Sequence, residues 1–312
     1  MEIPDENQKQ KNVERIIDRI ITLIKYRLWG NLTVDRFRTW QKQFETEHEL
    51  YYAIYLAQQL VYYSKKDILS MISYCIANSI KGFILNQTET LDQSYTKLEW
   101  NSLMNDTKRN TLVCPLFIDS PAASGYLISR MLRDQGLIAE DELCNSYEQL
   151  IYKLKRRGNI KGIIFVDDMM GSGEQAKSAF KDTIDLDGKE TSLKRYLEEN
   201  FPEIPVTICV AVTPAQTLQD VEEELGCIVI AGEVLTGKHD VLSSLFWGEK
   251  RFDEGQRFLQ KMQQNYRIPL TGHGTNAWSV TFEHGTPDNT SPFYYASPNG
   301  WTSLIRYRGE DV

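Results

Sequence analysis

The stretch Lys161–Thr183 constrains the fold of this chain more than any other. It opens with a short apolar run, Ile163–Val166, of the kind that forms a strand buried on both faces of a parallel sheet. Two adjacent carboxylates, Asp167 and Asp168, come next, and a turn of small residues follows them. From Gln175 onward the pattern is helical. The stretch therefore predicts a strand, an acidic pair, a glycine-rich turn and a helix, in that order.

This order of elements suits a site for a phosphorylated sugar. A glycine-rich turn that opens onto a helix N-terminus presents unpaired N–H groups and a partial positive charge, and both favour phosphate. Open α/β sheets bind ligands at the carboxyl ends of their strands, where the acidic pair is expected. Carboxylates accept hydrogen bonds from sugar hydroxyls or hold a metal that carries phosphate. The pattern thus indicates a ribose 5-phosphate pocket; the alternative is a buried strand that ends in a solvated turn.

The segment IIFVDDMMGSG resembles the phosphoribosyl pyrophosphate (PRPP) signature of type I phosphoribosyltransferases. It is not a P-loop, because no Gly-Lys-Ser/Thr closes it. The resemblance implies that Asp167 and Asp168 are the catalytic pair on the ribose hydroxyls. It also implies a Mg²⁺ ion that bridges the ribose diol and the pyrophosphate, so that the pair would reach the metal only indirectly, through those hydroxyls. The residues expected to bind the 5-phosphate are Gly171, Ser172, Gly173, Glu174 and Gln175.

Three positions depart from the family pattern. Gly171 stands where purine-salvage members often carry an acidic residue credited as the general base. Gln175 stands where a threonine hydroxyl commonly meets the 5-phosphate. Glu174 places a negative charge in a phosphate loop, which is tolerable only if the side chain points to solvent or caps the helix. These departures weaken the expectation of catalysis more than that of ligand binding.

A second strand, loop and helix precede this stretch. Residues 111–118 read as a strand in which Pro115 favours an edge, a bulge or a break. A loop of small residues at 119–125 and a helix at 126–132 follow. In the family this loop contacts pyrophosphate, and by resemblance the candidates here are Ala123, Ser124 and Gly125. A plain capping turn is the alternative.

Further alternation of strands and helices sets the fold class. Strands are predicted at 205–212 and 227–231, with a helix at 217–225 between them, which implies a parallel sheet with right-handed crossovers. Residues 12–85 show helical spacing of apolar residues. We therefore expect an α/β protein with a type I phosphoribosyltransferase-like parallel sheet flanked by helices. The expected domains are an N-terminal helical module at 1–90 and an α/β domain at 91–312, whose tail from about 266 forms a hood.

The tail sharpens the resemblance. A strand at 278–282, the turn TPDNTSP and a terminal Trp-x-x-Leu-x-Arg resemble the phosphoribosyltransferase-like effectors of bacterial anti-phage and conflict systems, including retron-associated ones. Asp288 stands where an asparagine is expected in that turn. The resemblance implies that Trp301 stacks on a base and that Asn289 and Arg306 read base or phosphate. Hydrophobic packing is the alternative for each aromatic residue.

Composition limits the classes of partner. The net charge of −8 argues against broad nucleic-acid binding, and we expect no direct sequence-specific contact with nucleic acid. The basic cluster 153–157 reads as a solvated helix end or as a lip over a polyanion. No run approaches the roughly 20 apolar residues of a membrane span, and five scattered cysteines suit a reducing cytoplasm. The expected partners are PRPP or a nucleotide, and a protein encoded by a neighbouring defence gene. A homo-oligomer stays open.

The sequence leaves three functions open. In the first, the chain is an enzyme that transfers or hydrolyses at ribose C1. In the second, it is a silent sensor that binds PRPP or a nucleotide and signals to a partner through the helical module. In the third, it is a scaffold that has lost the ligand. An unused buried acidic pair would be costly, so Asp167 and Asp168 argue against the scaffold.

Overall fold

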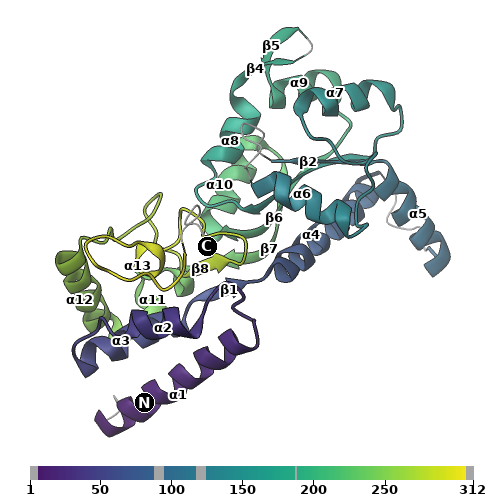
Figure 1. Ribbon diagram of the computed structural model, residues 1–312. Coiled ribbons are helices and arrows are strands. Elements are labelled where there is room, and N and C mark those ends of the chain that lie inside the picture. The colour runs from purple at the N-terminus through teal and green to yellow at the C-terminus, as the bar shows by residue number, and fades with distance from the viewer. Residues whose placement is uncertain (1–5, 88–94, 117–123, 187, 307–312) are drawn as a thin grey trace. The chain divides into compact units, whose positions relative to one another are not determined.

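A computed structural model of the chain describes residues 6–87, 95–116, 124–186 and 188–306 (Figure 1). The chain divides into two compact units, which are described separately. Unit 1 joins Met1–Asp67 to Leu235–Val312, and unit 2 is Ile68–Val234. This division differs from the expected domains at 1–90 and 91–312, because the first helices and the tail share one unit.

Unit 2 contains the parallel sheet that the sequence predicts. Its strands are β2 (Thr111–Pro115), β3 (Gly162–Met169), β6 (Val206–Pro214) and β7 (Ile228–Leu235), in the order β2-β3-β6-β7. β3 pairs in parallel with both β2 and β6. The fold class is thus confirmed as α/β with a parallel sheet.

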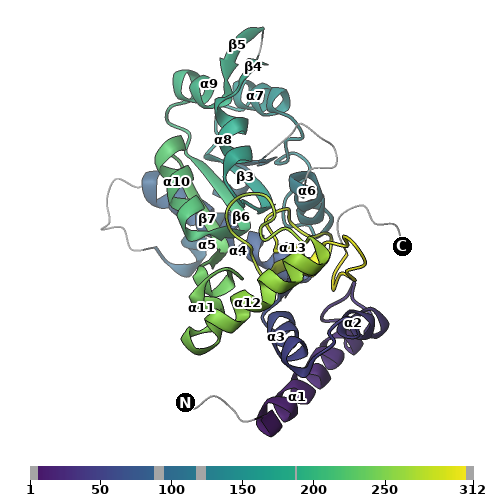
Figure 2. The ribbon, with the colours of Figure 1, turned by 90° about the vertical axis from the view of Figure 1, so that its left-hand side faces the viewer.

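Helices cover both faces of this sheet, because its strands are apolar on both sides. One face packs on α7 (Tyr147–Arg156), α8 (Glu174–Lys181), α9 (Leu193–Asn200) and α10 (Ala215–Leu225). Phe165 of β3 contacts Phe180 of α8 there, with ring centroids 4.9 Å apart. α8 and α10 lie side by side (Figure 2). The remaining elements are α5 (Lys97–Arg109), α6 (Ser124–Asp134) and a hairpin of β4 (Thr183–Leu186) and β5 (Lys189–Ser192).

The long helix α4 (Lys65–Gln87) covers other parts of the sheet. By length and composition its residues 65–86 could cross a membrane, with a mean hydropathy of 1.5, and no other helix of the described ranges meets that test. Within unit 2, however, Ser79 Oγ lies 3.2 Å from Cys209 Sγ of β6. The ring of Phe83 lies over Gly162, where a Cβ atom would meet it at 2.2 Å. These are the contacts of a core helix.

Unit 1 is built from both ends of the chain. Its elements are α1 (Glu6–Lys25), α2 (Val34–Gln41), α3 (Glu47–Gln58), β1 (Val61–Tyr63), the short 3₁₀ helix η1 (Gly237–His239), α11 (Ser244–Trp247), α12 (Glu249–Tyr266), β8 (Val280–Phe282) and α13 (Pro292–Tyr295). β1 pairs in parallel with β8. The Arg36 guanidinium of α2 donates to the carbonyls of Ser303, at 3.1 Å, and Ile305, at 3.2 Å. The part of the predicted helical module up to Asp67 and the predicted hood therefore form one packed body, whereas most of α4 belongs to unit 2.

Three local features bear on the sequence pattern. α3 ends at Gln58, and β1 follows it. The polar stretch at 95–110 contains α5, whose start is fixed by a capping box between Thr96 and Glu99. The strand expected at 111–118 is observed to Pro115, and residues 117–118 lie outside the described part.

Candidate functional site

The acidic pair lies inside β3, whereas the sequence suggested that it follows the end of the strand. β3 continues to Met169 because β6 continues alongside it, with Asp167 opposite Val210 and Met169 opposite Val212. The Met170 amide extends the ladder by one bond to the Val212 carbonyl, at 3.0 Å. Both carboxylates are therefore held by a regular strand, near the carboxyl edge of the sheet.

The two carboxylates are almost fully buried, with exposed fractions of 4% for Asp167 and 2% for Asp168. One oxygen of Asp167 accepts hydrogen bonds from the Ser124 hydroxyl, at 2.5 Å, and from the Asp168 amide, at 2.8 Å. One oxygen of Asp168 accepts from the Met169 amide, at 2.7 Å. These bonds fix the orientation of both side chains.

Burial also changes the protonation of the pair. Desolvation, followed by the neighbouring charge of Asp168, raises the pKa of Asp167 to about 8, although the bonds from Ser124 and the Asp168 amide oppose the shift. At neutral pH Asp167 therefore keeps its proton beside Asp168. Such a pair can both donate and accept a hydrogen bond, which suits a diol, and it would lose its proton if a cation or a cationic centre approached.

The start of α6 meets the acidic pair. Ser124 is the first residue of α6 and donates to Asp167. Gly125 packs so tightly that a Cβ atom would lie 3.1 Å from Pro115 Cβ and 3.1 Å from the Val166 carbonyl oxygen. The structure thus brings two of the expected pyrophosphate residues to the edge of the sheet beside the acidic pair. The third, Ala123, lies outside the described residues.

The glycine-rich turn adopts a conformation that needs glycine. Gly173 is the N-cap of α8 and has a φ of +80°, in the left-handed region. A Cβ atom there would also lie 2.7 Å from a Val221 methyl group of α10. Only glycine therefore lets α8 begin at this point while α10 packs against the turn. The first N–H groups of α8 have no carbonyl one turn earlier, so the helix start can serve an anion.

Two threonines that the sequence analysis missed hold the turn from the neighbouring strand and helix. The hydroxyl of Thr213, at the end of β6, donates to the Met170 carbonyl at 2.9 Å. The hydroxyl of Thr217, in the first turn of α10, donates to the Gly171 carbonyl at 2.8 Å. Nothing local in the sequence marks these threonines, because their role depends on the register of β6 against β3.

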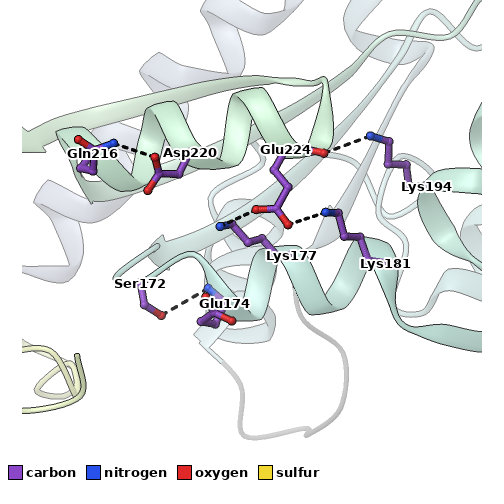
Figure 3. A network of polar contacts seen from close by, with 8 residues as sticks. All are labelled: Ser172, Glu174, Lys177, Lys181, Lys194, Gln216, Asp220 and Glu224. Carbon is purple, nitrogen blue, oxygen red and sulfur yellow. Dashed lines mark hydrogen bonds and ion pairs between the residues drawn. The ribbon is translucent and has the colours of Figure 1, made fainter. Parts of the chain in front are cut away.

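The remaining loop residues face solvent. Ser172, Glu174 and Gln175 are exposed, and the Ser172 hydroxyl accepts a long bond of 3.4 Å from the Glu174 amide (Figure 3). Glu174 occupies the first turn of α8, where a negative charge stabilises the helix. The concern that Glu174 would repel phosphate is therefore relieved, since its side chain points into water.

An ion-pair network ties α8 to α10 behind the loop. Glu224 of α10 lies 2.6 Å from Lys177 and 2.5 Å from Lys181 of α8 (Figure 3). Hydrogen bonds from Lys177 and Lys181 lower the pKa of Glu224 to about 2. Both lysines of α8 are thus engaged away from the turn, and the backbone supplies the positive character at Gly171–Gly173.

The expected base-binding residues lie in unit 1. The Trp301 ring is 2% exposed and packs against Phe44 and Tyr266, with centroids 5.7 and 5.1 Å away. The Asn289 amide donates to the His273 carbonyl at 2.6 Å. The carbonyl of Arg306 accepts from Thr286 at 2.8 Å. Trp301 is therefore a core residue of unit 1, and the base-reading roles of all three stay predictions.

The basic cluster 153–157 is mostly engaged in structural contacts. Lys153 donates to the carbonyls of Asp141 and Leu143, at 3.0 and 2.6 Å. Arg157 lies 3.9 Å from the Asp141 carboxylate. These contacts tie the cluster to the segment between α6 and α7, which favours the helix-end interpretation over a lip above a polyanion.

The oxygen atoms around Asp167 and Asp168 suit Mg²⁺ by chemical type but are too few to hold the ion alone. Carboxylate and hydroxyl oxygens are the ligands that Mg²⁺ prefers. Across the described ranges, however, no group of three His, Cys, Asp or Glu side chains could hold a metal ion. Asp167 and Asp168 alone could offer a cation only part of its shell. A Mg²⁺ ion here would have to take most of its ligands from a bound substrate and from water.

Comparison with known proteins adds one match. A family model described as PRTase-CE matches residues 37–306. The matched range includes the acidic pair, the glycine-rich turn and the tail up to Arg306. Searches of curated proteins and of solved structures return no match.

Proposed function

Because the chain belongs to the PRTase-CE family of phosphoribosyltransferase-like proteins, we propose that unit 2 binds PRPP or a nucleotide at the VDDMMGSG segment. The ribose hydroxyls would bond to Asp167 and Asp168, and the 5-phosphate would accept from backbone N–H groups of Gly171–Gln175. The observation that carries this proposal is the arrangement at one sheet edge. There the start of α6 bonds to the buried acidic pair through Ser124, and the glycine-capped start of α8 follows that pair in the chain.

The acidic pair and the backbone N–H groups of the turn would bind different parts of the ligand, according to their charge. The acidic pair can accept from a diol and, through the proton on Asp167, also donate to it. The N–H groups at the start of α8 offer fixed partial positive charge to a phosphate that would otherwise be repelled by the carboxylates. The Ser124 hydroxyl already donates to Asp167, so it would position that carboxyl group, while backbone N–H groups near Gly125 would meet pyrophosphate.

We propose Mg²⁺ as the cofactor, held mainly by the ligand and water and indirectly by Asp167 and Asp168. When bound, it would neutralise pyrophosphate charge as that group leaves C1. The chain itself would orient the ribose through the acidic pair and hold the phosphate through the turn.

Two outcomes at ribose C1 remain within the proposal. An enzyme would transfer the phosphoribosyl group to a base or to water through an oxocarbenium-like transition state, which fixed donors and charge stabilise. A sensor would bind the same ligand and return it intact. The glycine at position 171, where the family often has an acidic base, favours the sensor as a second candidate.

We further propose that the protein acts in the cytoplasm as an effector of a bacterial anti-phage or conflict system. The support is the likeness of the tail, with its TPDNTSP turn and terminal Trp-x-x-Leu-x-Arg, to such effectors. In this setting consumption of a nucleotide pool would stop growth, or ligand occupancy would be signalled to a partner protein.

Phosphorus NMR on the purified protein tests the site. Wild type, the Asp167→Asn/Asp168→Asn double variant and an Asp220→Asn control are mixed with PRPP and Mg²⁺, with and without a pool of bases and nucleotides. Asp220 is exposed on α10, so its substitution changes charge without touching the acidic edge.

New phosphate signals in wild type and the control, absent in the double variant, would support an enzyme, and their dependence on added base would identify transfer or hydrolysis. Line broadening without new signals, again lost in the double variant, would support the sensor. Unchanged PRPP spectra with wild type, both alone and with the products of neighbouring genes, would contradict the proposed site.

A further inference from the structure

The turn after β3 is held from outside by two consecutive hydrogen bonds. Thr213 donates to the carbonyl of Met170, and Thr217 donates to the carbonyl of Gly171. Thr213 is fully buried and Thr217 is 8% exposed, so both hydroxyls are shielded from competing water. The methyl group of Thr217 would also lie 3.1 Å from a Cβ atom at Gly173. One residue of α10 thus contacts two of the three turn residues.

These bonds determine where the turn's N–H groups point. In a planar trans peptide, the carbonyl of one residue and the N–H of the next point in opposite directions. Fixing the Met170 carbonyl on Thr213 therefore directs the Gly171 N–H away from β6. Fixing the Gly171 carbonyl on Thr217 likewise directs the Ser172 N–H away from α10. Two successive N–H groups are aimed at the side of the turn that the threonines do not occupy.

We propose that Thr213 and Thr217 are positioning residues that set the phosphate affinity of this turn by aiming the N–H groups of Gly171 and Ser172. The inference rests on the proposed function for the identity of the ligand, but its geometry does not. It also accounts for a departure in the sequence. Gln175 replaces the threonine that commonly meets the phosphate, and here threonines act behind the turn and leave its front to the backbone.

The test compares variants that separate the hydroxyl group of Thr217 from the shape of its side chain. Thr217→Val keeps the shape and removes the hydroxyl, Thr217→Ser keeps the hydroxyl, and Thr207→Val removes another buried hydroxyl of β6, six residues before Thr213. Calorimetry with PRPP and Mg²⁺ should give a Kd about tenfold higher for Thr217→Val, the size of one lost hydrogen bond. Thr217→Ser and Thr207→Val should stay within about twofold of wild type.

A second measurement does not need a ligand. The amides of Met170 and Lys177 are bonded on either side of the turn, to Val212 and Gly173. Their hydrogen exchange, followed by NMR, should be about tenfold faster in Thr217→Val than in wild type and should be restored in Thr217→Ser.

The outcomes separate the two claims. If wild type does not bind PRPP, the proposed function fails, and the exchange rates alone decide whether Thr217 positions the turn. Wild-type exchange rates in Thr217→Val would overturn the inference. So would wild-type PRPP affinity in that variant, or an equal loss of affinity in Thr207→Val, since the latter would indicate a general loss of stability.

Discussion

Replacing Asp167 by asparagine should stabilise unit 2 at neutral pH. An asparagine oxygen can still accept from the Ser124 hydroxyl and the Asp168 amide, so the local bonds of the wild-type side chain are kept. The difference is that the amide never ionises. Asp168 would then be the one ionisable member of the pair, beside an amide donor.

The size of the effect follows from the pKa of Asp167, which burial and the charge of Asp168 raise from 3.8 to about 8. Between these values the folded protein holds a proton that the unfolded chain has released, so the free energy of unfolding falls as pH rises. Each pH unit in that window costs about 1.4 kcal/mol. From about pH 5 to about pH 7, wild type should therefore lose about 2–3 kcal/mol relative to Asp167→Asn.

Hydrogen exchange of the β3 amides is the suitable assay, corrected for the intrinsic pH dependence of exchange. Tryptophan fluorescence would not serve, because Trp100 is the one tryptophan of unit 2 and the other five belong to unit 1. The measurements are made without divalent cations, since a bound cation would shift the pKa of Asp167. Asp220→Asn, on the exposed face of α10, is the control for loss of one carboxylate.

Stabilities of wild type and Asp167→Asn that change in parallel with pH would refute the shifted proton on Asp167. If the stability difference between wild type and Asp167→Asn stays constant from about pH 5 to about pH 7, Asp167 carries no shifted proton. A difference that grows equally in Asp220→Asn would assign the effect to net charge. A variant that gains stability and still binds PRPP with wild-type affinity would support the shifted proton and would show that PRPP binding does not need a carboxyl group at position 167.

Three further perturbations probe other features. Gly173→Ala should cost about 2–4 kcal/mol, measured by exchange of the α8 amides, because the added Cβ atom strains a left-handed backbone and meets α10. Gly188→Ala, with a φ of +75° and open space around its Cβ position, should cost only the backbone part. Equal losses in the two variants would contradict a contribution from packing against α10. Arg36→Met should destabilise unit 1 by about 2 kcal/mol or more and speed proteolysis of the tail, and the exposed Arg38→Met should not; an intact tail would count against the contacts of Arg36. Glu224→Gln should weaken unit 2 at low ionic strength and match wild type at high salt, because the network is exposed and screened; a loss that survives high salt would show a packing role.

The sheet of unit 2 could be predicted because its strands are short, apolar and bounded by turn residues. The acidic pair and the glycine-rich turn were also placed correctly along the chain. The position of the acidic pair relative to the end of the strand was not predicted correctly, since the sequence suggested that β3 ends at Val166. The strand continues to Met169 because β6 supplies partners as far as Val212, and the length of a neighbouring strand leaves no trace in the local pattern.

The features that the sequence did not reveal depend mostly on distant pairs. No periodicity indicates that Thr217 would meet Gly171, or that Arg36 would meet Ser303. α5 is a different case: the Thr96–Glu99 capping box was a readable signal in a polar stretch. Long-range contacts decided which elements share a unit, and local chemistry decided which elements form.

The pairing of β1 with β8 has a consequence for how the protein is made. Val61 and its partner Val280 are separated in the chain by the whole of unit 2. During synthesis the apolar faces of α1–α3 leave the ribosome long before the segments that cover them. Unit 2 can fold before the second half of unit 1 has been synthesised. Nascent chains stalled before residue 235 should therefore recruit chaperones through their first helices, and a premature stop in the tail should release a protein with an intact sheet and an exposed, aggregation-prone beginning.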